Sequence, residues 1–61
     1  MLSRREKEVL QNIAKGRSDS DISKILFISL RTAKKHHNNI LHKLSLHKTT
    51  ELVALAKECG I

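Results

Sequence analysis

Apolar side chains recur every three or four residues along most of this chain, which is the spacing of one face of an α-helix. Short polar turns separate four such stretches, and the pattern predicts helices at about residues 4–15, 19–26, 30–44 and 49–59. No segment alternates convincingly between apolar and polar positions, as a strand with one buried face would. We therefore predict an all-α fold in which four short helices share one small core.

Serine residues mark the predicted starts of the first three helices. Ser3 and Glu6 have the spacing of a capping box, in which each side chain bonds the backbone N–H of the other residue. Ser18 and Asp21 repeat this spacing, and Ser29 is the predicted cap of the third helix. These three boundaries rest on capping chemistry as well as on periodicity.

The predicted core consists of the inward faces of the helices. Its members are Val9, Leu10, Ile13, Ala14, Ile22, Ile25, Leu26, Ala33, His37, Ile40, Leu44, Leu52, Leu55, Ala56 and Cys59. Phe27 and Ile28, between the second and third helices, are expected to plug this core. For His37 we expect one ring nitrogen to bond a nearby carbonyl, because buried polar groups are hydrogen-bonded. Val53 is left over on the outer side of the last helix.

Size and composition exclude several classes of function. Sixty-one residues form one domain whose small core leaves no room for a deep substrate cleft. The serines are explained as caps, so we expect no catalytic residues, no enzyme activity and no cofactor. A single cysteine, Cys59, excludes an internal disulfide and favours a reducing compartment, and the expected location is therefore cytoplasmic. No apolar stretch is long enough to span a membrane.

Positive charge is concentrated in one part of the chain. Residues 22–50 hold six Lys or Arg, all four His and no acidic residue, and they account for the net charge of +6. Segregated positive charge on a small domain favours a nucleic acid as partner. Phe27 is the only aromatic residue, which argues against stacking on single strands and favours a duplex.

The third predicted helix carries the chemistry that a duplex would need. Opposite its core positions lie Arg31, Lys34, Lys35, Asn38 and His42. Lysine and arginine donate to guanine in the major groove, and asparagine pairs with adenine. Flanking positions, suited to phosphates, hold Thr32, His36, Asn39 and Lys43. Backbone amides near Ser18 and Ser29 add anion sites at two helix starts. Together with the preceding helix and turn, this helix forms a segment, at about residues 18–44, with the proportions of a helix-turn-helix. An ordinary charged helix on a protein surface would, however, show the same distribution of charged and apolar residues around its axis.

Two alternatives belong to other classes of function. A metal site would draw on His36, His37, His42, His47 and Cys59, but no pair of them has the one-turn spacing of a helical zinc site. A protein-interaction module could instead use Val53 and Lys57 on the outer side of the last helix.

Several short motifs occur together in one order and spacing. They are Leu2-Ser3 with Arg5-Glu6 and Glu8-Val9-Leu10; Ile13-Ala14 with Gly16 and Ser18; Ile22, Leu26 and Ile28-Ser29; Thr32 with Lys34 and His36; Asn39-Ile40 and Lys43-Leu44; and Glu51, Ala56 and Gly60. With these motifs nearly the whole chain resembles the LuxR-type helix-turn-helix domain, also called FixJ- or GerE-type, and we expect this one domain to span residues 1–61. The resemblance implies the DNA-binding domain of a bacterial transcriptional regulator, usually at the C-terminus of a two-component response regulator or a ligand-sensing activator.

The resemblance also implies roles for individual residues. It implies that Lys34, Lys35 and Asn38 read bases and that Thr32 and Lys43 contact the DNA backbone. The pattern of charges and helix caps adds four further candidates for backbone contact, which are Ser18, Ser29, Arg31 and His36. Dimerisation on DNA through the last helix is expected at Thr50, Val53 and Lys57. The implied partners are double-stranded DNA and a second copy of the chain, with RNA polymerase as a further candidate.

A few positions depart from the family pattern. Ala33 stands where valine is usual, and His37 where an aliphatic residue is preferred. Lys48 and Thr49 lack the usual cap and arginine at the start of the last helix. None of these departures touches the base-reading set. A sigma-factor region-4-like domain is a further alternative, against which the tail TTELVALAKECGI argues.

Overall fold

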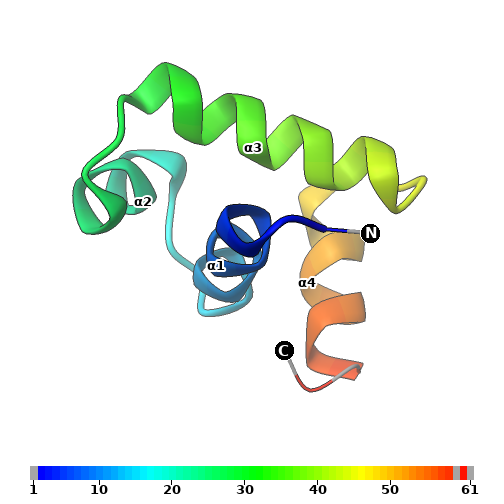
Figure 1. Ribbon diagram of the computed structural model, residues 1–61. Helices are drawn as coiled ribbons and strands as arrows, with labels where there is room; N and C mark the ends of the chain where they lie inside the picture. Colours follow the sequence, from blue (N-terminus) through cyan, green and yellow to red (C-terminus); the bar gives the residue numbers. More distant parts are fainter. Residues whose placement is uncertain (1, 59, 61) are drawn as a thin grey trace.

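A computed structural model describes residues 2–58 and 60 of the chain, and four helices account for most of them (Figure 1). These are α1 (Arg4–Ala14), α2 (Asp19–Leu26), α3 (Leu30–Lys43) and α4 (Thr49–Glu58). The all-α prediction is confirmed, and α1 and α3 each end one residue before the predicted boundary. Cys59, the last predicted residue of α4, lies outside the described residues.

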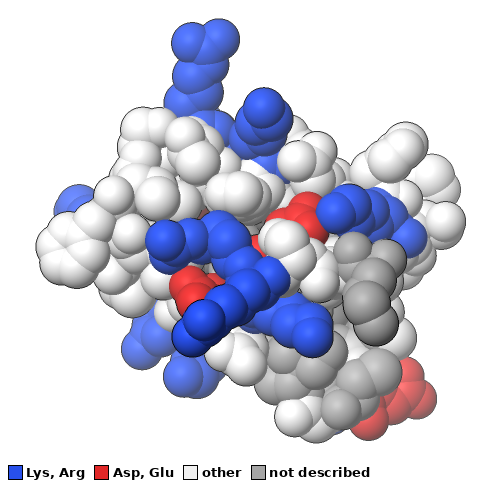
Figure 2. Space-filling view, in the orientation of Figure 1, with Lys and Arg blue, Asp and Glu red and all other residues white. Residues whose placement is uncertain are grey.

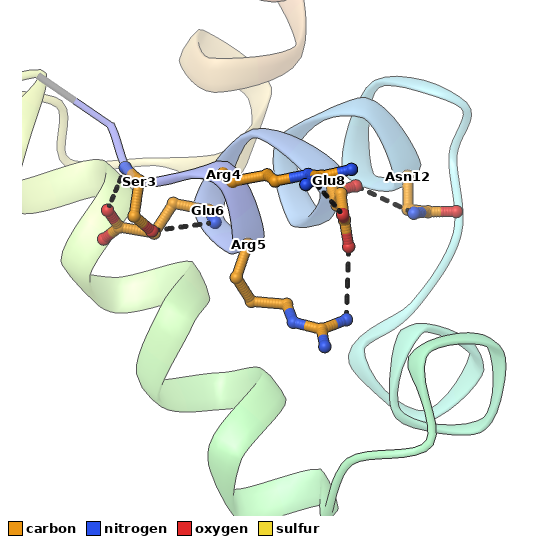
Figure 3. A network of polar contacts seen from close by, with 6 residues as sticks. All are labelled: Ser3, Arg4, Arg5, Glu6, Glu8 and Asn12. Carbon is orange, nitrogen blue, oxygen red and sulfur yellow. Dashed lines mark hydrogen bonds and ion pairs between the residues drawn. The ribbon is translucent and has the colours of Figure 1, made fainter.

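The helix starts follow the predicted capping chemistry. Ser3 N–H donates to Glu6 Oε1 at 2.8 Å and Glu6 N–H donates to Ser3 Oγ at 3.2 Å, which completes a capping box (Figure 3). The same reciprocal bonds join Ser18 and Asp21 at 3.3 and 3.2 Å. These starts are therefore fixed by residues within one turn of each other.

The helices are arranged around α1. In Figure 1, α3 runs along one side of the molecule from α2 to α4, and α1 lies beneath it. α3 packs against α2 and α1, whereas α4 packs mainly against α1. This arrangement leaves the side of α3 that faces away from α1 without a neighbouring helix.

The core draws one or more side chains from each helix. Its buried members are Val9, Leu10, Ile13, Ile22, Ala33, Ile40, Leu52 and Ala56. Partly buried residues packed against them are Leu2, Ala14, Leu26, Ile28, Leu41, Leu44, Leu46 and Val53. The core prediction is thus confirmed for its centre on every helix.

Two predicted core residues at the end of α2 are exposed. Phe27 is 95 % exposed and Ile25 is 45 % exposed, so both assignments were wrong. Phe27 caps α2 in the left-handed conformation, with φ 56° and ψ 43°. This conformation ends the helix, and the Phe27 side chain stands in solvent while the next residue, Ile28, packs against the core.

The inward face of α4 also differs from the prediction. Val53, expected on the outer side, packs partly against the core and lines an open hollow together with Ile13. Leu55 is half-buried and lies outside the core cluster. The buried face of α4 is still centred on Leu52 and Ala56, but it extends toward Val53 and not toward Leu55. The packing of α4 against α1 sets this orientation.

Candidate nucleic-acid interface

The outer face of α3 is a continuous polar and cationic surface. Its exposed residues are Arg31, Lys34, Lys35, Asn38, Asn39, His42 and Lys43. Ala33 and Ile40 on the opposite side are fully buried, and they fix the rotation of the helix. Figure 2 shows Lys and Arg side chains standing out from α3 into solvent. The helical wheel therefore placed the outward set correctly.

The cations of α3 and α1 differ in their partners. In α1, Arg5 Nη1 lies 3.1 Å from Glu8 Oε2, and Arg4 Nε lies 4.0 Å from Glu8 Oε1 (Figure 3). Among the described residues, Arg31, Lys34 and Lys35 form no ion pair. Their charge is available to an external anion, whereas Glu8 partly offsets the charge of α1.

The start of α3 is arranged to receive an anion. Ser29 Oγ accepts from Thr32 N–H at 3.1 Å and donates to Thr32 Oγ1 at 2.9 Å. The first turn holds no acidic residue, and Arg31 in that turn is exposed. Backbone N–H groups, the positive end of the helix dipole and a cation thus coincide there.

The start of α2 is occupied by the protein's own carboxylates. Asp21 accepts from Ser18 N–H, and Asp19 lies in the same first turn beside the ring of His37. Two acidic residues oppose a phosphate at this position. Of the two serines expected near anion sites, Ser29 therefore has surroundings that favour a phosphate more than those of Ser18.

Lys43 has a partner inside the protein. Its Nζ lies 2.7 Å from Glu6 Oε1, and the side chains of Lys43 and Glu6 are 44 % and 5 % exposed. The hydrogen bond from the Lys43 ammonium, followed by that from Ser3 N–H, lowers the pKa of Glu6 from 4.5 to about 2. Sequence reasoning gave Glu6 only a capping role, and nothing in the local sequence reveals a partner 37 residues away.

His37 lies inward, as predicted, with a side chain that is 15 % exposed. The prediction that a ring nitrogen bonds a carbonyl was wrong, because both ring nitrogens bond side-chain oxygens of other types. Nδ1 lies 2.8 Å from Asp19 Oδ1, and Nε2 lies 2.9 Å from Thr49 Oγ1. Both partners stand at the first position of a helix, Asp19 in α2 and Thr49 in α4. The periodicity that placed His37 could not reveal them, because both are distant in sequence.

The predicted dimerisation residues share one side of α4 but differ in exposure. Thr50 and Lys57 are exposed, whereas Val53 is half-buried against the core. Ala54, one turn after Thr50, is exposed and was not considered from the sequence. It offers a small apolar surface beside the two polar residues.

Metal and membrane roles find no support in the described part of the chain. Residues 2–58 and 60 contain no group of three or more His, Cys, Asp and Glu that could hold a metal ion. Cys59, a ligand in that alternative, lies outside these residues. None of the described helices has the length and apolar character needed to cross a membrane.

Comparison with known families decides the classification. The sequence pattern of the family described as "Bacterial regulatory proteins, luxR family" matches residues 1–56. The chain belongs to the LuxR family. As a LuxR-family domain it is a DNA-binding regulator domain and not an enzyme.

Similar proteins include bacterial regulators. The uncharacterized response regulatory protein YgeK of Escherichia coli (strain K12) is 38 % identical over 60 residues, which cover 98 % of this chain and 41 % of that protein. The uncharacterized transcriptional regulatory protein YhcZ of Bacillus subtilis (strain 168) is 46 % identical over 55 residues, covering 90 % and 26 %. The oxygen regulatory protein NreC of Staphylococcus epidermidis is 45 % identical over 56 residues, covering 92 % and 26 %. This LuxR-family chain thus spans less than half the length of these curated relatives.

Proposed function

We propose that this LuxR-family domain binds double-stranded DNA at specific sequences, with α3 in the major groove. The supporting observation is the outer face of α3, where exposed cations and amides stand without an acidic neighbour on the helix. An α-helix with its side chains is about 10–12 Å across, and the major groove is about 12 Å wide. The side of α3 without a neighbouring helix therefore suits insertion into the groove (Figure 1).

Base reading is assigned to Lys34, Lys35 and Asn38. All three are exposed, and Asn38 lies one turn after Lys34 on the same face of α3. Lysine donates to guanine O6 and N7, and the asparagine amide both donates to and accepts from adenine. The proposal is that these residues set the sequence preference.

Phosphate contacts are assigned to residues at the start and sides of α3. Ser29 caps the anion-favouring first turn and Arg31 lies in it, whereas Thr32 and His36 are half-buried at the side of the helix. Such contacts fix the register of a protein on the duplex without reading sequence. Lys43 is also assigned a phosphate contact, which would use the ammonium N–H groups that are not donated to Glu6.

Dimerisation is assigned to α4, through Thr50, Ala54 and Lys57 with the exposed part of Val53. The domain measures 27 × 20 × 19 Å, so two copies fit on half-sites spaced about 34 Å apart, one turn of DNA. Because this surface is small and partly polar, we expect free monomers that pair on DNA. The whole protein is then a transcriptional regulator in which this domain is the effector, with RNA polymerase as a candidate partner.

The division between base and phosphate contacts is the first testable prediction. Lys34→Ala and Asn38→Ala should each cost about 1–3 kcal/mol on the specific duplex and relax the base preference at one position. Arg31→Ala should weaken all duplexes similarly and reduce the salt dependence by about one unit of slope. Binding constants on specific and random duplexes, measured at several salt concentrations, check both expectations.

Lys15→Ala is the matched control, because this exposed lysine directly follows α1 and lies outside α3. It removes the same charge and should change sequence preference at no position. Equal losses on specific and random DNA for Lys34→Ala and Asn38→Ala would refute the assignment of base readers.

A further inference from the structure

The polar side chains that join different helices are few in this domain. Among the described residues, the side-chain hydrogen bonds between helices are those of His37 and of Lys43. Lys43 joins α3 to α1, whereas His37 joins α3 to both α2 and α4. His37 therefore occupies a position that the proposed DNA contacts leave unexplained, since its ring points away from the exposed face of α3.

The partners of His37 lie where two helices begin. Asp19 is the first residue of α2, and Thr49 is the first residue of α4. α4 packs mainly against α1, so its orientation relative to α3 receives little support from direct packing between these two helices. The bond of 2.9 Å from His37 Nε2 to Thr49 Oγ1 supplies a direct link between them.

We propose that His37 is a positioning residue for DNA recognition, which holds α3 against the starts of α2 and α4. Through Asp19 it fixes the two helices of the helix-turn-helix, and through Thr49 it fixes the angle between the base-reading face and the dimerisation helix. The inference rests on the proposed function, because it assigns His37 the geometry that lets two copies read two half-sites together.

The chemistry of the ring suits this role. Nδ1 and Nε2 lie on different edges of one rigid ring and point in different directions within its plane, so one imidazole reaches two helices with two hydrogen bonds. In the neutral ring, Nδ1–H donates to the Asp19 carboxylate and Nε2 accepts from the Thr49 hydroxyl. In the protonated ring, Nε2–H donates to the same hydroxyl oxygen, because a hydroxyl group both donates and accepts. The link between the three helices thus persists in either protonation state.

Charged groups around the ring are accounted for. Asp19 approaches from α2, and Arg17, from the turn before α2, lines the same hollow as His37 and Thr49. Arg17 Nη1 is bonded to Asn12 Oδ1 at 2.6 Å. The carboxylate of Asp19 is thus the direct ionic neighbour of His37 among the described residues.

The first experiment uses the free domain. His37→Leu keeps a side chain that packs but makes neither hydrogen bond, and Thr49→Val removes only the bond to α4. Residual dipolar couplings should show a changed orientation of α4 relative to α3 in both variants, and little further change when they are combined. His47→Leu is the matched control, since His47 is exposed in the turn before α4, and it should leave the orientation unchanged.

The second experiment measures DNA binding on duplexes with one and with two half-sites. Thr49→Val should keep half-site affinity within about twofold and reduce two-site cooperativity about threefold to tenfold, the size expected from one lost hydrogen bond. His37→Leu also loses the bond to Asp19, so it should show at least the same loss of cooperativity together with a weaker half-site affinity. His37→Gln should recover part of the cooperativity, because its amide N–H donates and its carbonyl accepts. Unfolding midpoints of all variants show whether each remains folded.

Three outcomes overturn the proposal: an unchanged orientation of α4 in folded His37→Leu, an equal loss of cooperativity in His47→Leu, or equal losses in His37→Leu and His37→Gln. Failure of the unaltered domain to prefer any duplex would instead refute the proposed function. In that case the orientation of α4 in the free variants still decides the role of His37.

Discussion

At the scale of single residues, Glu6 combines two tasks that the sequence suggests only in part. Its carboxylate accepts from Ser3 N–H at the start of α1 and from the Lys43 ammonium at the end of α3. Because the side chain is 5 % exposed, the charge is sustained by these donors and not by water. The same bonds that cap one helix therefore attach the far end of another.

This arrangement predicts a loss of stability in acid. Folding lowers the pKa of Glu6 from 4.5 to about 2, so the unfolded chain binds more protons between these values. The contribution of Glu6 is complete above about pH 4.5 and is lost as pH falls toward about 2. Urea unfolding at a series of pH values should show this loss, and Glu6→Gln should lack that part of the pH dependence.

Lys43→Met separates the structural role of the ammonium from a role at phosphates. Because the buried carboxylate loses its cationic partner, the variant should be clearly less stable at pH 7 and differ less from the unaltered domain at pH 2. Unchanged stability at pH 7 would show that the pair contributes nothing to the fold and would leave the proposed phosphate contact as the only role assigned to Lys43.

At the scale of elements, the features that can be predicted from the sequence are those set by residues close together in the chain. Serine caps and apolar periodicity place the four helices within a residue or two, because both act over a single turn. The rotation of α4 and the exposure of Phe27 depend on packing between helices, which no local pattern encodes. The outer face of α3 was predictable for the same reason as its buried face, whereas the partners of His37 and Lys43 were not.

The backbone of Phe27, at the end of α2, is strained, and a substitution at this residue tests the cost of that strain. Phe27 has φ 56°, a region that costs about 1 kcal/mol or more for a bulky side chain, and its ring is 95 % exposed. Phe27→Asn should stabilise the domain by about 0.5–1 kcal/mol, since asparagine tolerates this conformation and little apolar contact is lost. Thermal unfolding of the variant checks the expectation.

Ser45 provides the comparison, because it also has a positive φ of 56° and carries a small side chain. Ser45→Asn should change stability less than Phe27→Asn. A less stable Phe27→Asn variant would show that the ring packs in solution against a surface of the domain.

At the scale of the whole molecule, the core is small: residues 2–58 and 60 include eight buried apolar side chains. The domain of 61 residues is therefore expected to be only marginally stable. A ligand that binds only the folded state then has a large relative effect. Specific duplex at about one hundred times its dissociation constant should raise the free energy of unfolding by about 2.7 kcal/mol. Calorimetry at increasing duplex concentration checks this value. Random duplex at equal concentration should raise the free energy of unfolding less. Equal stabilisation by both duplexes would contradict sequence-specific binding.

The packing of α4 mainly against α1 has a consequence for how the domain opens. With only Leu52 and Ala56 fully buried, α4 can detach while α1, α2 and α3 keep most of the core. Its amide protons should then exchange with solvent through a subglobal opening of lower free energy than complete unfolding. On the proposed dimerisation through α4, copies of the domain would exchange partners by releasing this one short helix, while α1, α2 and α3 stay folded.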